Sequence, residues 1–154
     1  MSVAAWVERL LATAAVLGGY PVTEHPPPVA RVPLSTLQQA GCAGGPCEAQ
    51  GAYIPGRGVL LLDTLDIDGN PRDRSVLVHE LVHYLQDRFG RFGKESACDR
   101  YVDREMEAYG VQDRYLSRYN MGLGQYDSAP AWLPVSCLRE LAGPDGPVQT
   151  EQGR

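Results

Sequence analysis

Two histidines and a glutamate form the pattern with the clearest chemical meaning in this sequence. His79, Glu80 and His83 stand in the order H-E-x-x-H inside a largely apolar stretch. Residues four apart on an α-helix lie on one face, about one turn from each other, so both imidazoles can bind one metal ion. Glu80 is adjacent in sequence to the first imidazole and can reach a water molecule at that ion. The pattern therefore predicts a Zn²⁺ site with a carboxylate general base, which is the arrangement that activates water for hydrolysis.

A catalytic zinc ion usually has three protein ligands and one water molecule, so the predicted site needs one more side chain. The next predicted helix carries two candidates, Glu105 and Glu107. These positions differ by about 200° around a regular helix, so both cannot face the same ion. The remaining histidine, His25, stands beside a run of prolines, where we expect an exposed side chain that binds nothing. The spacing by itself leaves Glu105 and Glu107 as alternatives.

The two helices resemble the gluzincin branch of the zincin metallopeptidases. That family carries H-E-x-x-H on one helix and a glutamate ligand on the next, often within E-x-x-A-[DN]. The sequence EMEAY at residues 105–109 is similar to this second pattern. The resemblance implies that Glu105 binds zinc together with His79 and His83. It departs from the family at Tyr109, where an aspartate or asparagine often supports a histidine ligand.

Residues 50–120 also look like a family of small bacterial H-E-x-x-H proteins, which implies a minimal gluzincin with a peptide or protein as substrate. On this reading, Glu80 accepts the proton of the attacking water and later passes it to the leaving amine. A tyrosine or histidine usually stabilises the oxyanion in such a reaction. No histidine is left nearby in the sequence, and the tyrosine candidates are Tyr109, Tyr115, Tyr119 and Tyr126.

The alternative function is that of a zinc-binding or partner-binding domain without turnover. The glutamate of the H-E-x-x-H pattern argues against it, because a purely structural zinc site needs no general base. A site with three protein ligands argues against it as well, since structural zinc sites normally have four.

The elements that must position these residues predict one α+β domain over residues 1–154, mainly helical with a small antiparallel sheet, and the resemblance implies that this domain is zincin-like. We expect a helix at residues 3–18, a proline-rich extended connector at 20–33, a β-hairpin at about 50–62, metal-binding helices at about 73–88 and 96–119, and a tail at 120–154 with a short helix at 131–141. The edge of the hairpin could pair with an extended peptide through main-chain hydrogen bonds.

The net charge argues against nucleic acid as a partner, and the absence of a long apolar run argues against a membrane span. The formal net charge is −5, which argues against nucleic-acid binding because such proteins present a basic face. The sequence has no run of about 18 or more apolar residues, so we expect no membrane-spanning helix.

Four cysteines suggest an oxidising compartment. We expect one disulfide between Cys42 and Cys47, across a glycine- and proline-containing loop, and another between Cys98 and Cys137. A four-cysteine metal site and reduced thiols are the alternatives. Disulfides favour a periplasmic or secreted protein, although the apolar N-terminal residues are more typical of a true first helix than of a signal peptide.

Overall fold

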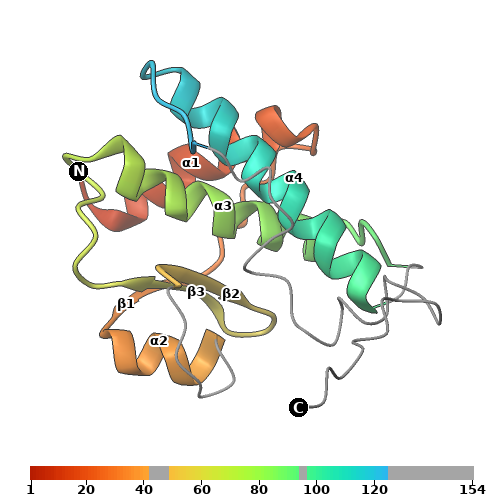
Figure 1. Cartoon of the computed structure of the whole chain (residues 1–154), viewed down its shortest axis with the longest axis horizontal. Helices are drawn as coiled ribbons and strands as arrows, with labels where there is room; N and C mark the ends of the chain where they lie inside the picture. The colour runs from red at the N-terminus through yellow and green to blue at the C-terminus, as the bar shows by residue number, and fades with distance from the viewer. Residues whose placement is uncertain (42–48, 94–96, 125–154) are drawn as a thin grey trace, which may run out of the picture.

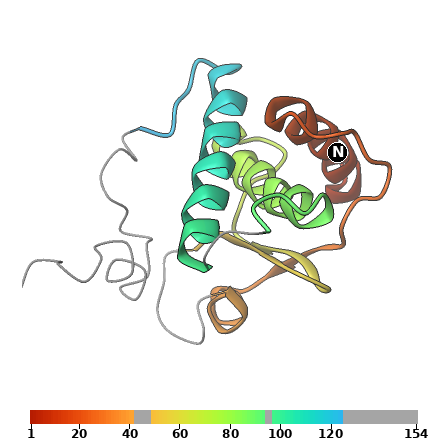
Figure 2. The same cartoon turned by 90° about the vertical axis from the view of Figure 1, so that its right-hand side faces the viewer.

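The computed structural model of the chain describes residues 1–41, 49–93 and 97–124, which contain four helices and three strands. These are α1 (Val3–Gly18), β1 (Val29–Val32), α2 (Leu34–Gly41), β2 (Gly51–Ile54), β3 (Gly58–Leu62), α3 (Pro71–Arg88) and α4 (Ala97–Ser117). The fold class is α+β, as predicted. Helix α3 lies at the centre and contacts α1, α4, β2 and β3, while α2 covers the other face of the sheet (Figures 1 and 2).

The sheet is mixed, whereas the sequence predicted an antiparallel one. The expected hairpin at residues 50–62 is present, with β2 antiparallel to β3 and Tyr53 opposite Val59. The last residues of the predicted connector form β1, which pairs in parallel with β3 so that Val29 lies opposite Val59. The strand order is β1-β3-β2, which leaves β2 at one edge. The prediction missed β1 because a parallel neighbour is joined through a long connection, and local patterns carry no sign of that pairing.

A glycine allows β3 to start beside the proline-rich segment. Gly58 has a φ of +109°, and a Cβ atom at this position would lie 2.3 Å from the carbonyl oxygen of Pro28. The next residue, Val59, donates its backbone N–H to that same oxygen at 2.8 Å. A side chain at residue 58 would therefore separate the two strands where their pairing begins.

The ends of the helices follow local rules. Helix α1 is followed by Gly19, its C-cap, which has a φ of +72° and acts as a glycine stop. Helix α3 begins at Pro71, two residues before the expected start, because Asn70 caps it by accepting the N–H of Arg72. The carboxylate of Asp73, in the first turn of α3, accepts the N–H of Asp66 at 2.8 Å and holds the preceding loop against that turn.

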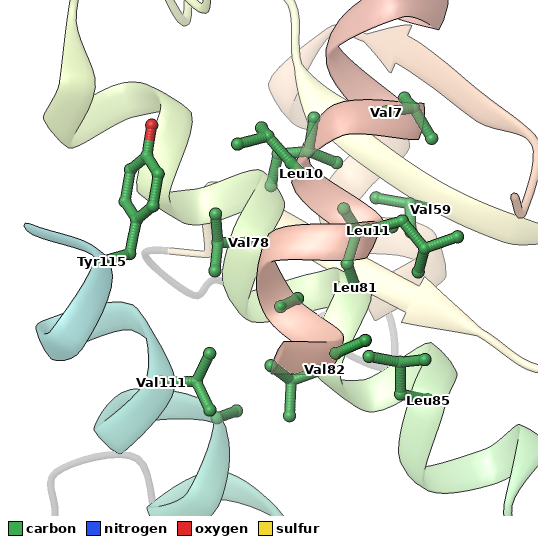
Figure 3. Packing of buried hydrophobic residues seen from close by; sticks show 14 of the residues in the cluster. Val7, Leu10, Leu11, Val59, Val78, Leu81, Val82, Leu85, Val111 and Tyr115 are labelled. Atoms are coloured by element: carbon green, nitrogen blue, oxygen red, sulfur yellow. The ribbon is translucent and has the colours of Figure 1, made fainter. Parts of the chain in front are cut away.

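The hydrophobic core surrounds α3 on several sides. Figure 3 shows Leu10 and Leu11 of α1 on one side of α3 and Val111 of α4 on another. The apolar side chains of α3 without exposed surface are Leu77, Val78, Leu81, Val82 and Leu85. Burying each such side chain contributes about 1.5–3 kcal/mol. The helix that carries H-E-x-x-H is thus the most firmly packed element among the described helices, as a metal site requires.

Several predictions fall outside the described residues. They include the disulfide between Cys42 and Cys47, the partner Cys137 of the buried Cys98, the candidate Tyr126 and the short helix at 131–141. These predictions stay open. Among the described residues, no helix is both long and apolar enough to cross a membrane.

Candidate metal centre

The structure brings His79, His83 and Glu105 together at the contact between α3 and α4. The two Nε2 atoms lie 3.1 Å apart. Glu105 places Oε2 3.2 Å from His79 Nε2 and Oε1 3.0 Å from His83 Nε2. Three ligand atoms around a tetrahedral zinc ion, with bonds of about 2.0–2.1 Å, lie about 3.3 Å from one another. The donor set and its spacing therefore fit a zinc ion.

Two glutamine side chains determine which nitrogen of each histidine carries the proton. Gln86 donates its amide N–H groups to the carbonyl oxygen of Arg104 and to Glu107, so its Oε1 faces His83 Nδ1 at 2.9 Å. An amide oxygen only accepts hydrogen bonds, so His83 Nδ1 must carry a hydrogen. The unprotonated Nε2 then faces the other ligand atoms. Among the described residues, every buried side-chain nitrogen and oxygen has a hydrogen-bond partner, so this network is complete.

His79 is held in the same way. Its Nδ1 lies 3.1 Å from Gln112 Oε1, and Gln112 donates from Nε2 to Ser75 Oγ at 2.9 Å. The Ser75 hydroxyl donates its hydrogen bond to the carbonyl oxygen of Arg72, so its oxygen must accept the hydrogen bond from Gln112. Both imidazoles thus direct Nε2 lone pairs toward the Glu105 carboxylate. Three electron-rich groups converging on one point require a cation between them, either a proton or a metal ion.

The charges in this cluster influence one another. Burial of the His83 ring opposes its protonation, but the hydrogen bond that the protonated ring donates to Glu105 and the charges of Glu80 and Glu105 outweigh it and raise the pKa of His83. Burial of Glu105 opposes its ionisation, but His79 and His83, when protonated, donate hydrogen bonds to it and carry positive charge, which holds its pKa far below the usual range. The pocket thus keeps a carboxylate ionised beside two imidazoles, which is what cation binding needs.

Glu107, the alternative third ligand, points away from the cluster. Its Oε2 accepts hydrogen bonds from Tyr20 at 2.6 Å and from Gln86 at 2.8 Å, and its Oε1 forms an ion pair with Arg91. The structure therefore places Glu105, and not Glu107, beside the two histidines. His25 lies in the connector, where its carbonyl oxygen accepts the Tyr84 hydroxyl, and its ring is not part of the cluster.

The side chain of Glu80 lies between its own helix, α3, and the edge strand β2. Its Oε2 accepts the backbone N–H of Tyr53 in β2 at 2.7 Å. Gly51, two residues earlier in β2, allows this close approach, because a Cβ there would lie 2.9 Å from Glu80 Cγ. The side chain of Glu80 is buried, and its charge contributes to the raised pKa of His83. The carboxylate is therefore held near the triad by the edge of the sheet.

The tyrosines that were candidates for oxyanion stabilisation fall into two groups. Tyr115 and Tyr119 hydrogen-bond to Arg74 at 3.4 and 3.3 Å and belong to a separate network. Tyr109 packs edge-on against His79, with ring centroids 4.5 Å apart. Burial, with the nearby charges of Glu105 and Glu80, raises the pKa of Tyr109 to about 12, so it stays protonated and can donate a hydrogen bond.

Sequence reasoning missed several residues around the centre. Tyr101 is one turn before Glu105, and burial and the charges of Glu105 and Glu80 raise its pKa too. The spacing of Tyr101, Glu105 and Tyr109 at intervals of four marks one helix face and could have identified it. Gln86 follows His83 by three residues, which places it on the same face. No local pattern in the sequence indicates that Gly51 lets Glu80 approach the strand, because that contact depends on where β2 meets α3.

Comparison of the chain with models of protein families, with curated proteins and with solved structures finds no match in any of the three.

Proposed function

We propose that this protein is a zinc-dependent hydrolase that cleaves peptide bonds, with Zn²⁺ held by His79, His83 and Glu105. The observation that carries this proposal is the convergence of two Nε2 lone pairs and the Glu105 carboxylate, beside Glu80, an acidic side chain on the same helix as the two histidines. A bound zinc ion would supply Lewis acidity, lowering the pKa of water and polarising a carbonyl group.

Glu80 is the general base in this proposal. The Tyr53 N–H fixes one of its oxygens, which limits the motion of the carboxylate without neutralising its charge. It can accept a proton from water and return it to the amine of the leaving group. Tyr109 and Tyr101 are the candidates for donating a hydrogen bond to the developing oxyanion, because they lie near Glu105 and Glu80 and keep their protons at neutral pH.

The edge of the sheet supports a peptide as the substrate class. Strand β2 is an edge strand that runs beside Glu80. An extended peptide can add to such an edge through main-chain hydrogen bonds, which would lay its backbone next to the general base. A compact small-molecule substrate would make no use of this strand.

The test compares the wild type with Glu80→Gln on a mixed peptide library analysed by mass spectrometry, with zinc content measured for both. We expect about one zinc per chain in each protein and cleavage by the wild type alone. Glu8→Gln makes the same chemical change at an exposed position of α1 and should cleave normally. Zinc binding without cleavage by the wild type would favour the zinc-binding domain without turnover, and absence of zinc would refute both functions.

A further inference from the structure

Gln86 lies at the crossing of α3 and α4 with no exposed surface. Its single oxygen accepts from His83, and its nitrogen donates to the carbonyl oxygen of Arg104 and to Glu107. The Arg104 carbonyl belongs to the residue that precedes Glu105. One amide thus orients a histidine of the triad and also joins α4 to α3 next to the carboxylate of the triad.

The orientation of this amide depends on Glu107. If Gln86 turned its amide around, its oxygen would face the Glu107 carboxylate and the Arg104 carbonyl, and its nitrogen would face a ring nitrogen of His83. Both contacts with acceptors would be repulsive, so Glu107 helps to keep the oxygen directed at His83. In turn, three groups hold Glu107: Gln86, the hydroxyl of Tyr20 and the guanidinium of Arg91.

Arg91 and Tyr20 connect this carboxylate to the end of α1. The Arg91 guanidinium lies 4.0 Å from the centre of the Tyr20 ring and donates to the carbonyl oxygen of Gly18 at 3.4 Å. Tyr20 follows the glycine stop of α1, and Arg91 is in the turn after α3. The chain of contacts therefore runs from the C-terminal end of α1, through Glu107 and Gln86, to His83.

We propose that Gln86 and Glu107 are positioning residues for His83, which set the direction of its Nε2 and keep it close to Glu105 before any metal binds. This proposal rests on the zinc site of the proposed function and adds two residues that do not contact the ion. His79 has a separate support in Gln112 and Ser75, which contains no ionised group. Disturbing Glu107 should therefore weaken zinc binding through one histidine only.

The experiment measures the zinc affinity of metal-free protein by competition with a chromophoric chelator at pH 7. We expect Gln86→Leu to bind zinc about 10–100-fold more weakly, as found when the partner of a ligating histidine is removed. Glu107→Leu should weaken binding by a smaller factor, about 3–10-fold. Glu107→Gln keeps an oxygen that can accept from Gln86 and should restore most of the affinity. Glu8→Gln, on the exposed face of α1, serves as the unaffected control.

Gln86 is fully buried, so Gln86→Leu could fail to fold, and the comparison of Glu107→Leu with Glu107→Gln then decides. A second readout is the visible absorption spectrum of the Co²⁺-loaded proteins, which should change in Glu107→Leu and return toward the wild type in Glu107→Gln. If the wild type binds zinc and both Glu107 variants bind it equally tightly with unchanged spectra, the positioning role is wrong while the proposed function stands. If the wild type binds no zinc, the proposed function fails first and the positioning role with it.

Discussion

Replacing Gly51 by alanine should separate the position of Glu80, the proposed general base, from the proposed binding of zinc. A Cβ atom at residue 51 would lie 2.9 Å from Glu80 Cγ, 3.0 Å from Val76 Cγ1 and 3.1 Å from Glu80 Oε1. Carbon atoms in contact normally lie about 3.5–4.0 Å apart, so Glu80 and β2 would have to move apart by about 0.6–1 Å. None of the three closest atoms belongs to His79, His83 or Glu105.

A displacement of about 1 Å in a catalytic group can cost about 100-fold in rate, so we expect kcat/KM of Gly51→Ala to fall about 10–100-fold. Overpacking costs about 1–3 kcal/mol, and the stiffer unfolded chain offsets about 0.4–1 kcal/mol of this, so the free energy of unfolding should fall by about 1–2 kcal/mol. Zinc affinity should stay at the wild-type value, because the metal ligands are not touched.

The assay combines peptide cleavage, chelator competition for zinc and denaturant unfolding on the same preparations. Gly122→Ala is the matched control, because its added Cβ would meet its nearest atom at 3.6 Å, an ordinary contact. Full activity in Gly51→Ala would refute the claim that β2 positions Glu80. Loss of zinc in parallel with activity would show that the substitution disturbs the triad itself, which also contradicts the argument.

Three further predictions concern the helices and the metal. Leu81→Ala should lower the free energy of unfolding by about 2–5 kcal/mol in a denaturant titration, because this side chain has no exposed surface; a loss below 1 kcal/mol would mean that α3 is not the packed centre. Gly110→Ala, within α4, should raise the free energy of unfolding by about 0.5–1 kcal/mol, since the added Cβ meets nothing closer than 3.6 Å and alanine favours helix. A lower free energy of unfolding in the same titration would contradict this. Zinc affinity should fall as the pH falls through the raised pKa of His83, starting above the usual histidine value of about 6.5, because protons compete for Nε2. The low pKa of Glu105 means that this carboxylate adds no competition in the same range, so affinity measured at several pH values that stays constant from pH 8 to 6 would be the contradicting result.

Local patterns predicted most of the helical framework. The helix at residues 3–18 is observed with the same bounds, and the hairpin at 50–62 is present. Both depend on signals that lie within a few residues, such as apolar spacing, a glycine stop and a Pro-Gly turn. The strand at Val29–Val32 was missed because its pairing partner in β3 is far along the chain.

Spacing alone left Glu105 and Glu107 as alternatives for a geometrical reason, and only the resemblance at residues 105–109 favoured Glu105. Glu105 is in one row of α4 with Tyr101 and Gln112, and this row faces the histidines. Glu107 faces Tyr20, at the end of α1. Both rows lie against neighbouring elements, so burial patterns in the sequence could not tell which neighbour each one meets.

The sequence by itself determined that two imidazoles and a carboxylate share one helix, because spacing by four residues is a local property of the backbone. Only the tertiary structure decided which carboxylate of α4 meets them, which amides orient their rings and which strand holds Glu80. These contacts depend on the rotation of α4 about its axis and on the position of β2 against α3. Both are set by packing between segments far apart in the chain, which no local pattern records.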